Sequence, residues 1–246
     1  MNNLLCLVYH EIDNDLKTGY SVSESQISEH LKLIKEQDLT VVTTNDLETS
    51  NNGKLLNLSF DDGADSDYKI VMPILEELNF KATFFITTGY IGKSGYMDWE
   101  QVKVLKKKGF DVQSHTRSHP LLGTLNKEKI KEELKTSKEI IEDKLVVEVK
   151  AISLPGGSFN KSVLETAFNC GYKYVFTSIP GLNSLGSNVY NRLLITQKTS
   201  LINFKKNISC DQLYIKKERL IYQIRNSLKK IIGPKIYYSL WRNYYK

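Results

Sequence analysis

The feature that most constrains the fold is a regular alternation of short apolar runs with longer segments of helical period. The apolar runs, rich in β-branched and aromatic residues, predict strands at residues 4–9, 40–44, 55–60, 82–87, 110–114, 149–154, 172–178 and 192–196. The segments between them predict helices at residues 24–37, 66–79, 98–108, 126–144 and 160–170. Alternating strands and helices build a parallel sheet or barrel covered by helices. We therefore expect an α/β fold.

The domain organisation follows from where this alternation stops. The chain has 246 residues, of which 41% are hydrophobic, enough to bury one substantial core. No repeat or low-complexity linker interrupts residues 1–205, so we expect one domain there and a separate tail at 206–246. From Lys216 onward, basic residues mix with Leu, Ile, Tyr and Trp at helical spacing, broken by Gly233 and Pro234. This pattern predicts two basic amphipathic helices.

Charge and cysteine usage limit the classes of protein only loosely. The net charge of +6 would suit an anionic partner, but an excess of this size is common in ordinary enzymes. The three cysteines are far apart and share no CxxC spacing, which argues against a disulfide framework and favours a reducing compartment. The apolar run before His10 is too short for a secretory signal or a membrane span. With Met1 as the natural start, we expect a cytoplasmic protein.

The first candidate site is the carboxylate pair Asp61 and Asp62, which follows a predicted strand and precedes Gly63. Side chains alternate between the two faces of a strand, so the two carboxylates need different roles. At the end of a barrel strand, one can bind a metal while the other stands beside the metal-bound water. A short Asp-Asp-Gly stretch is also a common turn or helix cap, and this segment alone leaves both interpretations open.

The second candidate is the pair His115 and His119, four positions apart directly after a predicted strand. If the segment coils through one turn, both imidazoles point the same way, and Pro120 then ends the turn. Two histidines and a carboxylate suit Zn²⁺ or a similar divalent ion and leave coordination positions open. The third candidate is the turn at 155–157, whose glycines would expose backbone N–H groups, as an oxyanion hole requires. A plain strand-to-helix turn explains this last stretch equally well.

In this order, the three stretches resemble the polysaccharide deacetylase family, also called the NodB-homology or carbohydrate esterase family 4 domain. Its members carry a T/S-F-D-D-G motif, matched at 59–63, and an H-S/T-x-x-H-P motif, matched at 115–120. A later proline-glycine turn is matched at 155–157, and the resemblance extends over residues 4–205. It implies a deformed (β/α) barrel of about seven strands with a helical C-terminal tail. It also implies hydrolysis of an N- or O-acetyl group on a sugar.

The resemblance also implies roles for individual residues. Asp62, His115 and His119 hold a divalent metal, with Zn²⁺ expected and Co²⁺ or Ni²⁺ as alternatives. Asp61 is the general base that deprotonates the metal-bound water, and the Gly156 backbone N–H helps stabilise the oxyanion.

The sequence departs from the family pattern at several places. No arginine precedes Pro155, where many members have one that orients the base, and Gly156 replaces the usual aromatic residue. The D-x-x-D-W motif is missing. No histidine follows His119, although the family uses a late one to protonate the leaving amine. These departures resemble the poly-N-acetylglucosamine deacetylase branch, in which an N-terminal histidine approaches the metal.

That branch points to His10 as the general acid, although a strand-end histidine bonded to a loop is the plain alternative. His30 lies at the edge of the apolar stripe of helix 24–37, which indicates a packing role. Arg192 aligns with an arginine often found before the last strand of the branch, and Asp65 and Asp67 read as the start of a helix. The sequence assigns no catalytic role to these three residues.

The expected substrate is an N-acetylated glycan, a nucleotide sugar or a lipid-linked sugar, met before export. The basic tail at 211–246 suits peripheral attachment to the inner face of the membrane, but helices packed on the barrel with a solvated basic face explain it equally well.

The sequence is also compatible with two other functions. One is a carbohydrate-binding protein on the same fold with weak or no turnover. The other is a nucleic-acid binder, for which the chain offers no recognised module, so no nucleic-acid partner is expected. The oligomeric state is not predicted.

Overall fold

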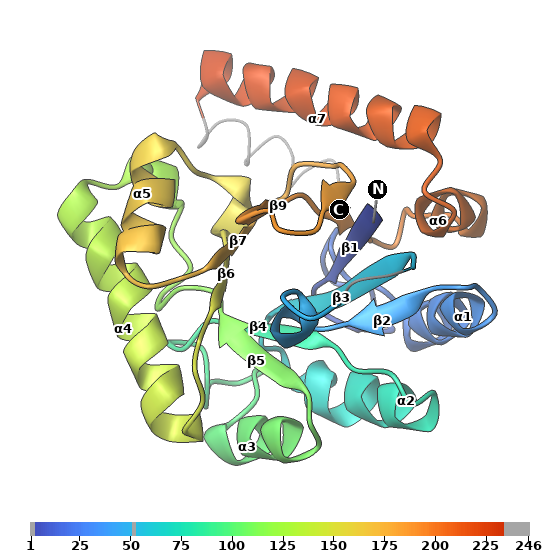
Figure 1. The fold of residues 1–246 in the computed structure, drawn as a ribbon, viewed down its shortest axis with the longest axis horizontal. Coiled ribbons are helices and arrows are strands. Elements are labelled where there is room, and N and C mark those ends of the chain that lie inside the picture. The colour runs from blue at the N-terminus through green and yellow to red at the C-terminus, as the bar shows by residue number, and fades with distance from the viewer. Residues whose placement is uncertain (1–2, 51–52, 234–246) are drawn as a thin grey trace.

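The computed structural model describes residues 3–50 and 53–233, and its centre is one curved sheet surrounded by helices (Figure 1). The strands are β1 (Asn3–Tyr9), β2 (Thr40–Val42), β3 (Leu55–Asp62), β4 (Thr83–Ile86), β5 (Asp111–Ser114), β6 (Ala151–Ser153), β7 (Tyr174–Phe176), β8 (Asn183–Ser184), β9 (Val189–Tyr190) and β10 (Leu193–Leu194). The α-helices are α1 (Glu24–Lys35), α2 (Met72–Glu77), α3 (Trp99–Lys107), α4 (Lys127–Leu145), α5 (Lys161–Asn169), α6 (Leu201–Ile208) and α7 (Gln212–Ile232).

The strand order makes the sheet a nearly closed barrel. Along the path β10-β1-β3-β4-β5-β6-β7-β9, every neighbouring pair is parallel. The two strands at the ends of this path, β9 and β10, are separated in the chain by only Asn191 and Arg192. One short segment therefore pairs with β7 on one side and with β1 on the other. The predicted (β/α) barrel is confirmed, and this segment occupies its seventh strand position.

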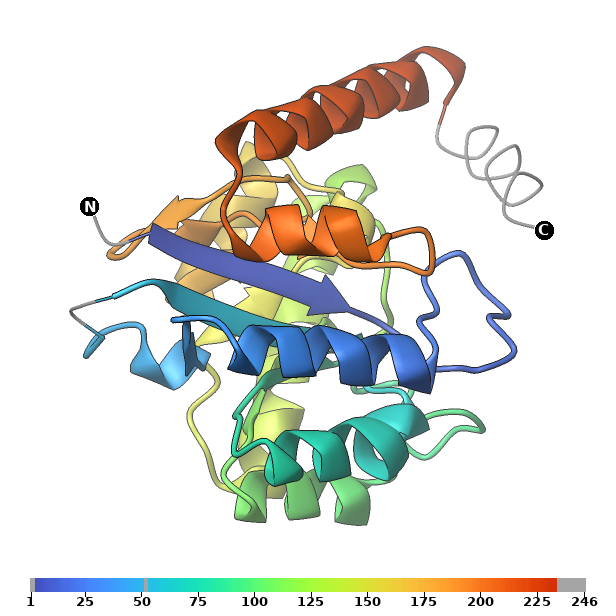
Figure 2. The ribbon, with the colours of Figure 1, turned by 90° about the vertical axis from the view of Figure 1, so that its right-hand side faces the viewer.

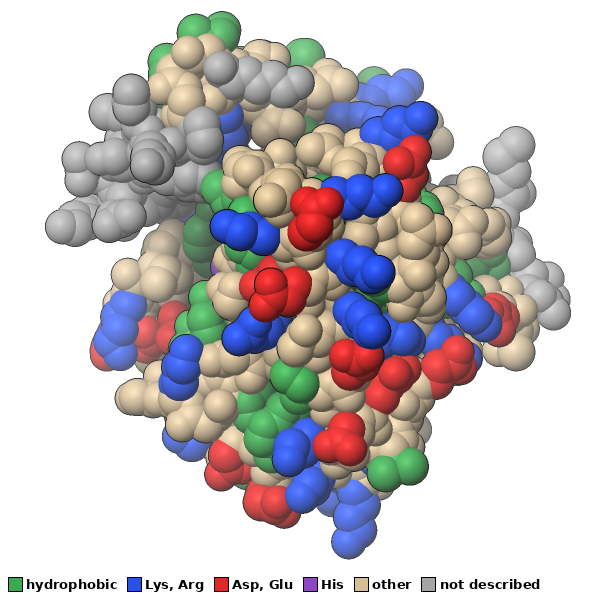
Figure 3. All heavy atoms as spheres, turned by 90° about the vertical axis from the view of Figure 1, so that its left-hand side faces the viewer, with side chains coloured by type: hydrophobic (Ala, Val, Ile, Leu, Met, Phe, Trp, Pro, Cys, Tyr) green, Lys and Arg blue, Asp and Glu red, His purple; other side chains and the backbone are tan. Residues whose placement is uncertain are grey.

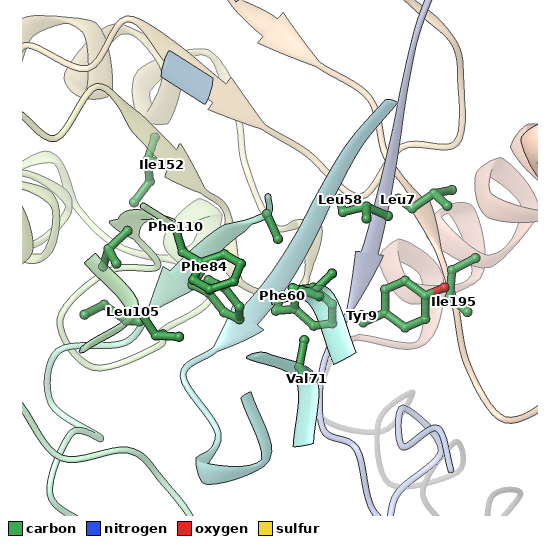
Figure 4. Close-up of a cluster of buried hydrophobic side chains, with 14 of the residues drawn as sticks. Leu7, Tyr9, Leu58, Phe60, Val71, Phe84, Leu105, Phe110, Ile152 and Ile195 are labelled. Atoms are coloured by element: carbon green, nitrogen blue, oxygen red, sulfur yellow. The ribbon is translucent and has the colours of Figure 1, made fainter. Parts of the chain in front are cut away.

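The two faces of the barrel strands bury different kinds of side chain. In β3, Leu58 and Phe60 point outward into the main core beneath the helices, where they meet residues such as Phe84 (Figure 4), and Leu56 belongs to the same core. The alternate positions of β3, Asn57, Ser59 and Asp61, belong to the buried polar residues. A second, smaller core includes Leu4, Cys6, Phe85, Phe176 and Tyr190. Because strand side chains alternate, the outer face carries most of the apolar burial and leaves the inner face free for polar groups.

The predicted helices are present, and their capping residues explain where they begin. Asp98 accepts a hydrogen bond from the Gln101 N–H at the start of α3, and Asn126 accepts one from the Lys129 N–H at the start of α4. The predicted helix at 66–79 instead begins as a π-helical turn, Asp67–Val71, that continues into α2. Short 3₁₀ segments lie at Thr44–Asp46, Leu122–Thr124 and Pro155–Gly157.

Helix α6 was not predicted, because its eight residues give too short a periodic pattern. It packs beside α1 (Figure 2), where the ring of Phe204 stacks on that of His30 with centroids 3.7 Å apart. His30 is buried, and its Nδ1 lies 3.1 Å from the Tyr9 hydroxyl. The packing role expected for His30 is confirmed.

The first predicted tail helix corresponds to α7, which begins at the Asp211 cap and ends at Gly233. Figures 1 and 2 both show it at the edge of the molecule, on the far side from α2 and α3. The second predicted tail helix, beyond Pro234, lies outside the described residues. The expected domain boundary after residue 205 falls within α6, and it stays a prediction. Among the described residues, no helix has the length and apolar character needed to span a bilayer.

Candidate metal and catalytic centre

Polar side chains meet at the carboxyl ends of the barrel strands, among them Asp61, Asp62 and His115, which the sequence singled out. Asp61 and Asp62 end β3, His115 directly follows β5, and Ser153 ends β6. Parallel strands end at the same edge of a sheet, so residues more than fifty positions apart in the chain converge here. The barrel therefore builds one polar centre at its mouth.

Asp61 is held by a buried arginine from the far end of the sequence. Arg192, which is 1% exposed, donates from Nη1 to Oδ1 and from Nη2 to Oδ2 of Asp61, both at 2.8 Å. Ser153 Oγ donates to Asp61 Oδ2 at 2.8 Å and accepts from Arg192 Nη2 at 2.7 Å. This two-point pairing fixes the plane of the carboxylate as well as its charge.

The same contacts keep Asp61 ionised inside the barrel, where it is 2% exposed. Burial by itself raises the pKa of its carboxyl, but the charges of Arg192 and His115 and the hydrogen bonds from Arg192 outweigh burial and hold the pKa below its ordinary value. Asp61 is therefore a carboxylate at neutral pH, with a fixed orientation beside the two histidines.

The side chain of Asp62 points away from Arg192 and toward the two imidazoles, because β3 ends at this residue. Its φ of 79° is in the left-handed region, which costs free energy for a residue with a Cβ. Its Oδ1 lies 3.4 Å from His115 Nε2 and 3.3 Å from His119 Nε2. The adjacent carboxylates thus have different environments, as the alternation rule predicted: Asp61 faces Arg192, and Asp62 faces the imidazoles.

His115 has one ring nitrogen fixed and the other directed at the carboxylates. Its Nδ1 lies 2.9 Å from the Ser153 carbonyl oxygen, which can only accept, so Nδ1 carries the proton and Nε2 faces Asp62. Burial lowers the pKa of His115, but Asp61 and Asp62 raise it above its ordinary value. The surroundings of this ring therefore favour positive charge.

His119 reaches the same point through a tight loop instead of the helical turn considered from the sequence. The His119 N–H donates to Thr116 Oγ1 at 3.0 Å, and both residues have positive φ, 60° and 68°. Glu133 on α4 accepts hydrogen bonds from the backbone N–H groups of Arg117 and Ser118. Burial, followed by the charge of His115, lowers the pKa of His119 to about 4.

These three residues fit a divalent cation. Ligand atoms of Asp62, His115 and His119 lie within 4.8 Å of one another. Asp62 Oδ1 is buried and has no hydrogen-bond partner in the part of the chain that the structure describes. A buried acceptor of this kind facing two imidazole nitrogens is the donor set that Zn²⁺ and similar ions take.

His10 follows β1, the strand that pairs with β3 on the side away from β4. Burial outweighs the opposing charges of Asp62 and Asp61 and holds the pKa of His10 below its ordinary value, and these charges act on the ring because it lies near both carboxylates. Its Nδ1 is buried and has no hydrogen-bond partner among the described residues. The structure therefore brings His10 to the same centre, and its role as an acid stays a prediction.

The turn that contains Gly156 also lies at the mouth of the barrel, directly after β6. Gly156 has φ 57° and ψ 15°, a left-handed conformation that favours glycine. The next residue, Gly157, is tightly packed, since a Cβ there would lie 3.0 Å from the Cβ of Ser178. The position of the turn agrees with the expectation, and the use of the Gly156 N–H as an oxyanion donor stays a prediction.

Known proteins with similar sequences identify the family of this chain. A sequence model of the polysaccharide deacetylase family matches residues 48–175, which include both carboxylates and both histidines. The chain belongs to the polysaccharide deacetylase family. The resemblance inferred from the motifs is confirmed.

Individual relatives agree with this assignment. The putative polysaccharide deacetylase YxkH of Bacillus subtilis is 27% identical over 192 residues, 75% of this chain and 67% of that protein. The poly-beta-1,6-N-acetyl-D-glucosamine N-deacetylase of Staphylococcus aureus is 27% identical over 199 residues, 72% of this chain and 69% of that protein. Among solved structures, the Streptococcus pyogenes deacetylase PplD in complex with acetate superposes with a TM-score of 0.77 at 25% identity, covering 84% of this chain and 98% of that one.

The sequence left open which residue orients Asp61. No arginine precedes the Pro155 turn, where many members of the family have one. Arg192 makes that contact from the segment that closes the barrel, through two hydrogen bonds to Asp61. The sequence pointed to Arg192 only through its alignment with an arginine of the poly-N-acetylglucosamine deacetylase branch and gave it no role, because its position next to Asp61 depends on closure of the barrel. Ser153 was missed for the same reason.

Asp67 is a second residue whose environment the sequence did not reveal. It begins the π-helical turn, as expected of a helix start, but it is fully buried. Neither of its carboxyl oxygens has a hydrogen-bond partner among the described residues. Burial, with the nearby charges of Asp62 and Asp61, raises the pKa of Asp67 well above its ordinary value.

Proposed function

We propose that the protein is a divalent-metal-dependent N-deacetylase acting on an N-acetylated sugar, most closely an N-acetylglucosamine-containing glycan. The observation that carries this proposal is the placement of an oriented, ionised Asp61 beside the Asp62, His115 and His119 cluster. The names of the Staphylococcus aureus relative and of a 32% identical Bacillus cereus relative, a peptidoglycan-N-acetylglucosamine deacetylase, support the substrate class.

The reaction divides into tasks that this chain's own residues can perform. Asp62, His115 and His119 would hold the ion, which supplies Lewis acidity and lowers the pKa of bound water when present. Asp61 accepts a proton as water adds to the acetyl carbonyl, and Arg192 keeps its carboxylate aimed and ionised before that step.

The later steps need a proton donor and an oxyanion contact. When the C–N bond breaks, the sugar nitrogen must gain a proton, and we assign that donation to His10, because its ring shares the field of Asp61 and Asp62. The Gly156 N–H is assigned to the oxyanion. The products are acetate, which takes the oxygen of the water, and the free amino sugar, which takes the proton from His10. Asp61 then releases its proton to solvent and His10 takes one up, so atoms and charge balance.

The same proposal places the enzyme at the cytoplasmic face of the membrane, acting on a lipid-linked N-acetylated glycan before export. The basic apolar sequence of the tail supports this placement. Its substrate then carries a lipid that remains in the bilayer while the sugar enters the barrel mouth.

An acetate-release screen tests the activity. Purified protein, stripped of metal and then supplied with Zn²⁺, Co²⁺ or Ni²⁺, is incubated with N-acetylated oligosaccharides, UDP-sugars and lipid-linked sugars. We expect release that depends on added metal and is abolished in Asp61→Asn. Binding of these glycans without acetate release under any metal would instead support the carbohydrate-binding alternative.

A further inference from the structure

Helix α7 has one face that packs on the barrel. Ile215 on this face is only 5% exposed and belongs to the main core. About two helical turns further along, the Tyr222 hydroxyl lies 3.5 Å from the position that a Cβ on Gly157 would take. The helix is therefore attached to the barrel next to the turn at the active-site mouth.

The opposite face of α7 is also apolar, and it is exposed. Its large hydrophobic residues have exposed fractions from 47% to 80%, and they are Leu213, Leu220, Ile224, Leu228 and Ile231. At 3.6 residues per turn these five lie within about 80° of the helix circumference, on the side away from Ile215 and Tyr222. We call these five residues the outer stripe. A helix that only covers a barrel needs one apolar face, so the second one requires a partner.

The charges around the outer stripe are almost all positive. By the same helical geometry, Lys217 lies within the stripe and Lys216 and Arg225 lie on either side of it. Arg219 and Lys229 lie nearer to the face that packs on the barrel, and the acidic residue of the helix is Glu218. Other parts of the surface are mixed: Figure 3 shows acidic and basic side chains interspersed on the face formed by α4 and α5. The helix that carries this apolar stripe and its positive border lies outside the segment that the family model matches.

We propose that the outer stripe of α7 is a docking surface for an anionic lipid bilayer, lying in the plane of the interface with its cations at the headgroups. An exposed apolar stripe flanked by Lys and Arg has the chemistry of helices that lie on such surfaces. A second copy of the chain would bring two positively charged borders together, which opposes pairing through this face. A nucleic acid would neutralise the cations but would leave the five apolar side chains in water.

Because Tyr222 attaches α7 beside the Pro155–Gly157 turn, a docked helix holds the barrel mouth close to the bilayer. This consequence rests on the proposed function, since it concerns how a lipid-linked sugar reaches the site. The docking itself does not depend on catalysis and can be measured separately.

Vesicle flotation of the full-length protein tests the proposal. Two preparations are compared, phosphatidylcholine alone and phosphatidylcholine mixed with phosphatidylglycerol. The stripe variant is Leu220→Gln/Ile224→Gln/Leu228→Gln, because glutamine keeps helix propensity. The charge variant is Lys216→Gln/Lys217→Gln/Arg225→Gln, which removes the three basic side chains within or beside the stripe. The matched control is Val146→Gln, which removes an 85% exposed apolar side chain at the end of α4.

We expect the wild-type protein and the control to float with the phosphatidylglycerol vesicles and to be released by salt. The charge variant should lose about fivefold in partitioning per cation, or about a hundredfold in all. The stripe variant should lose more than about tenfold. All variants should still release acetate from a non-lipidated substrate, so a failure of docking is distinguishable from a failure of the proposed activity.

Three results would overturn the proposal. The wild-type protein could remain unbound to both kinds of vesicle, or the stripe variant could float as well as the wild type. Light scattering could instead show a stable dimer that the stripe variant dissociates, which would assign the stripe to a second copy.

Discussion

Removal of the Arg192 side chain should damage both stability and catalysis, by amounts that follow from its contacts. The guanidinium makes five hydrogen bonds: two to Asp61 at 2.8 Å, and one each to Ser153 Oγ at 2.7 Å, Thr177 O at 3.0 Å and Ser59 Oγ at 3.2 Å. Truncating one member of a buried ion pair leaves the other charge uncompensated, at a cost of about 3–5 kcal/mol. Whole domains are stable by only about 5–15 kcal/mol. Arg192→Met should therefore lose a large fraction of the free energy of unfolding.

Urea unfolding followed by fluorescence measures the loss, and Arg117→Met is the control. Arg117 pairs with Glu132 at 2.9 Å, but both side chains are largely exposed, so its removal should cost no more than about 1 kcal/mol. The double variant Arg192→Met/Asp61→Asn should be clearly more stable than the sum of the two single losses predicts, because it no longer contains a buried Asp61 carboxylate without its positive partner.

Catalysis supplies a second readout for the same variant. Arg192 holds the pKa of Asp61 below its ordinary value against the opposing effect of burial. Without Arg192, Asp61 should take up a proton at higher pH, so the acid limb of the acetate-release profile should move to higher pH. An Arg192→Met protein within about 1 kcal/mol of wild type, with additive double-variant energies and an unmoved acid limb, would refute the reasoning.

Three further predictions concern other residues. His119→Ala should weaken Zn²⁺ binding by more than the 10- to 100-fold that is typical when a residue hydrogen-bonded to a ligand is lost. Titration calorimetry on metal-stripped protein measures this affinity. Equal affinity of the variant and the wild type would exclude His119 as a ligand. Asp67→Asn should raise the urea midpoint at neutral pH, because the raised pKa of Asp67 means that ionisation favours the unfolded state; a lower midpoint would contradict this. Burial lowers the pKa of His30 from 6.5 to about 4, so the unfolded state binds more protons between these values and stability should fall by about 3 kcal/mol as the pH drops through that window. His30→Asn should flatten this dependence, and an unchanged slope would show that His30 does not cause it.

Much of the fold could be predicted from local sequence patterns. Apolar alternation located the principal strands, and caps such as Asp98 and Asn126 located helix starts, because both signals act over a few residues. The secondary-structure elements that were not predicted are short. Helix α6 and strands β8 and β9 have too few residues for a periodic signal, and they form because neighbouring elements bury them.

The candidate centre also has a part that the sequence predicted and a part that it did not. By itself, the sequence determined which side chains could do chemistry: Asp61, Asp62, His115 and His119 stand in two short motifs directly after strands. Only the tertiary structure decided how they are held. Arg192 lies 131 positions from Asp61 in the chain, and it reaches that carboxylate because the segment between β9 and β10 closes the barrel. A hydrogen bond between distant residues depends on the path of the whole sheet, and no local pattern in the sequence records that path.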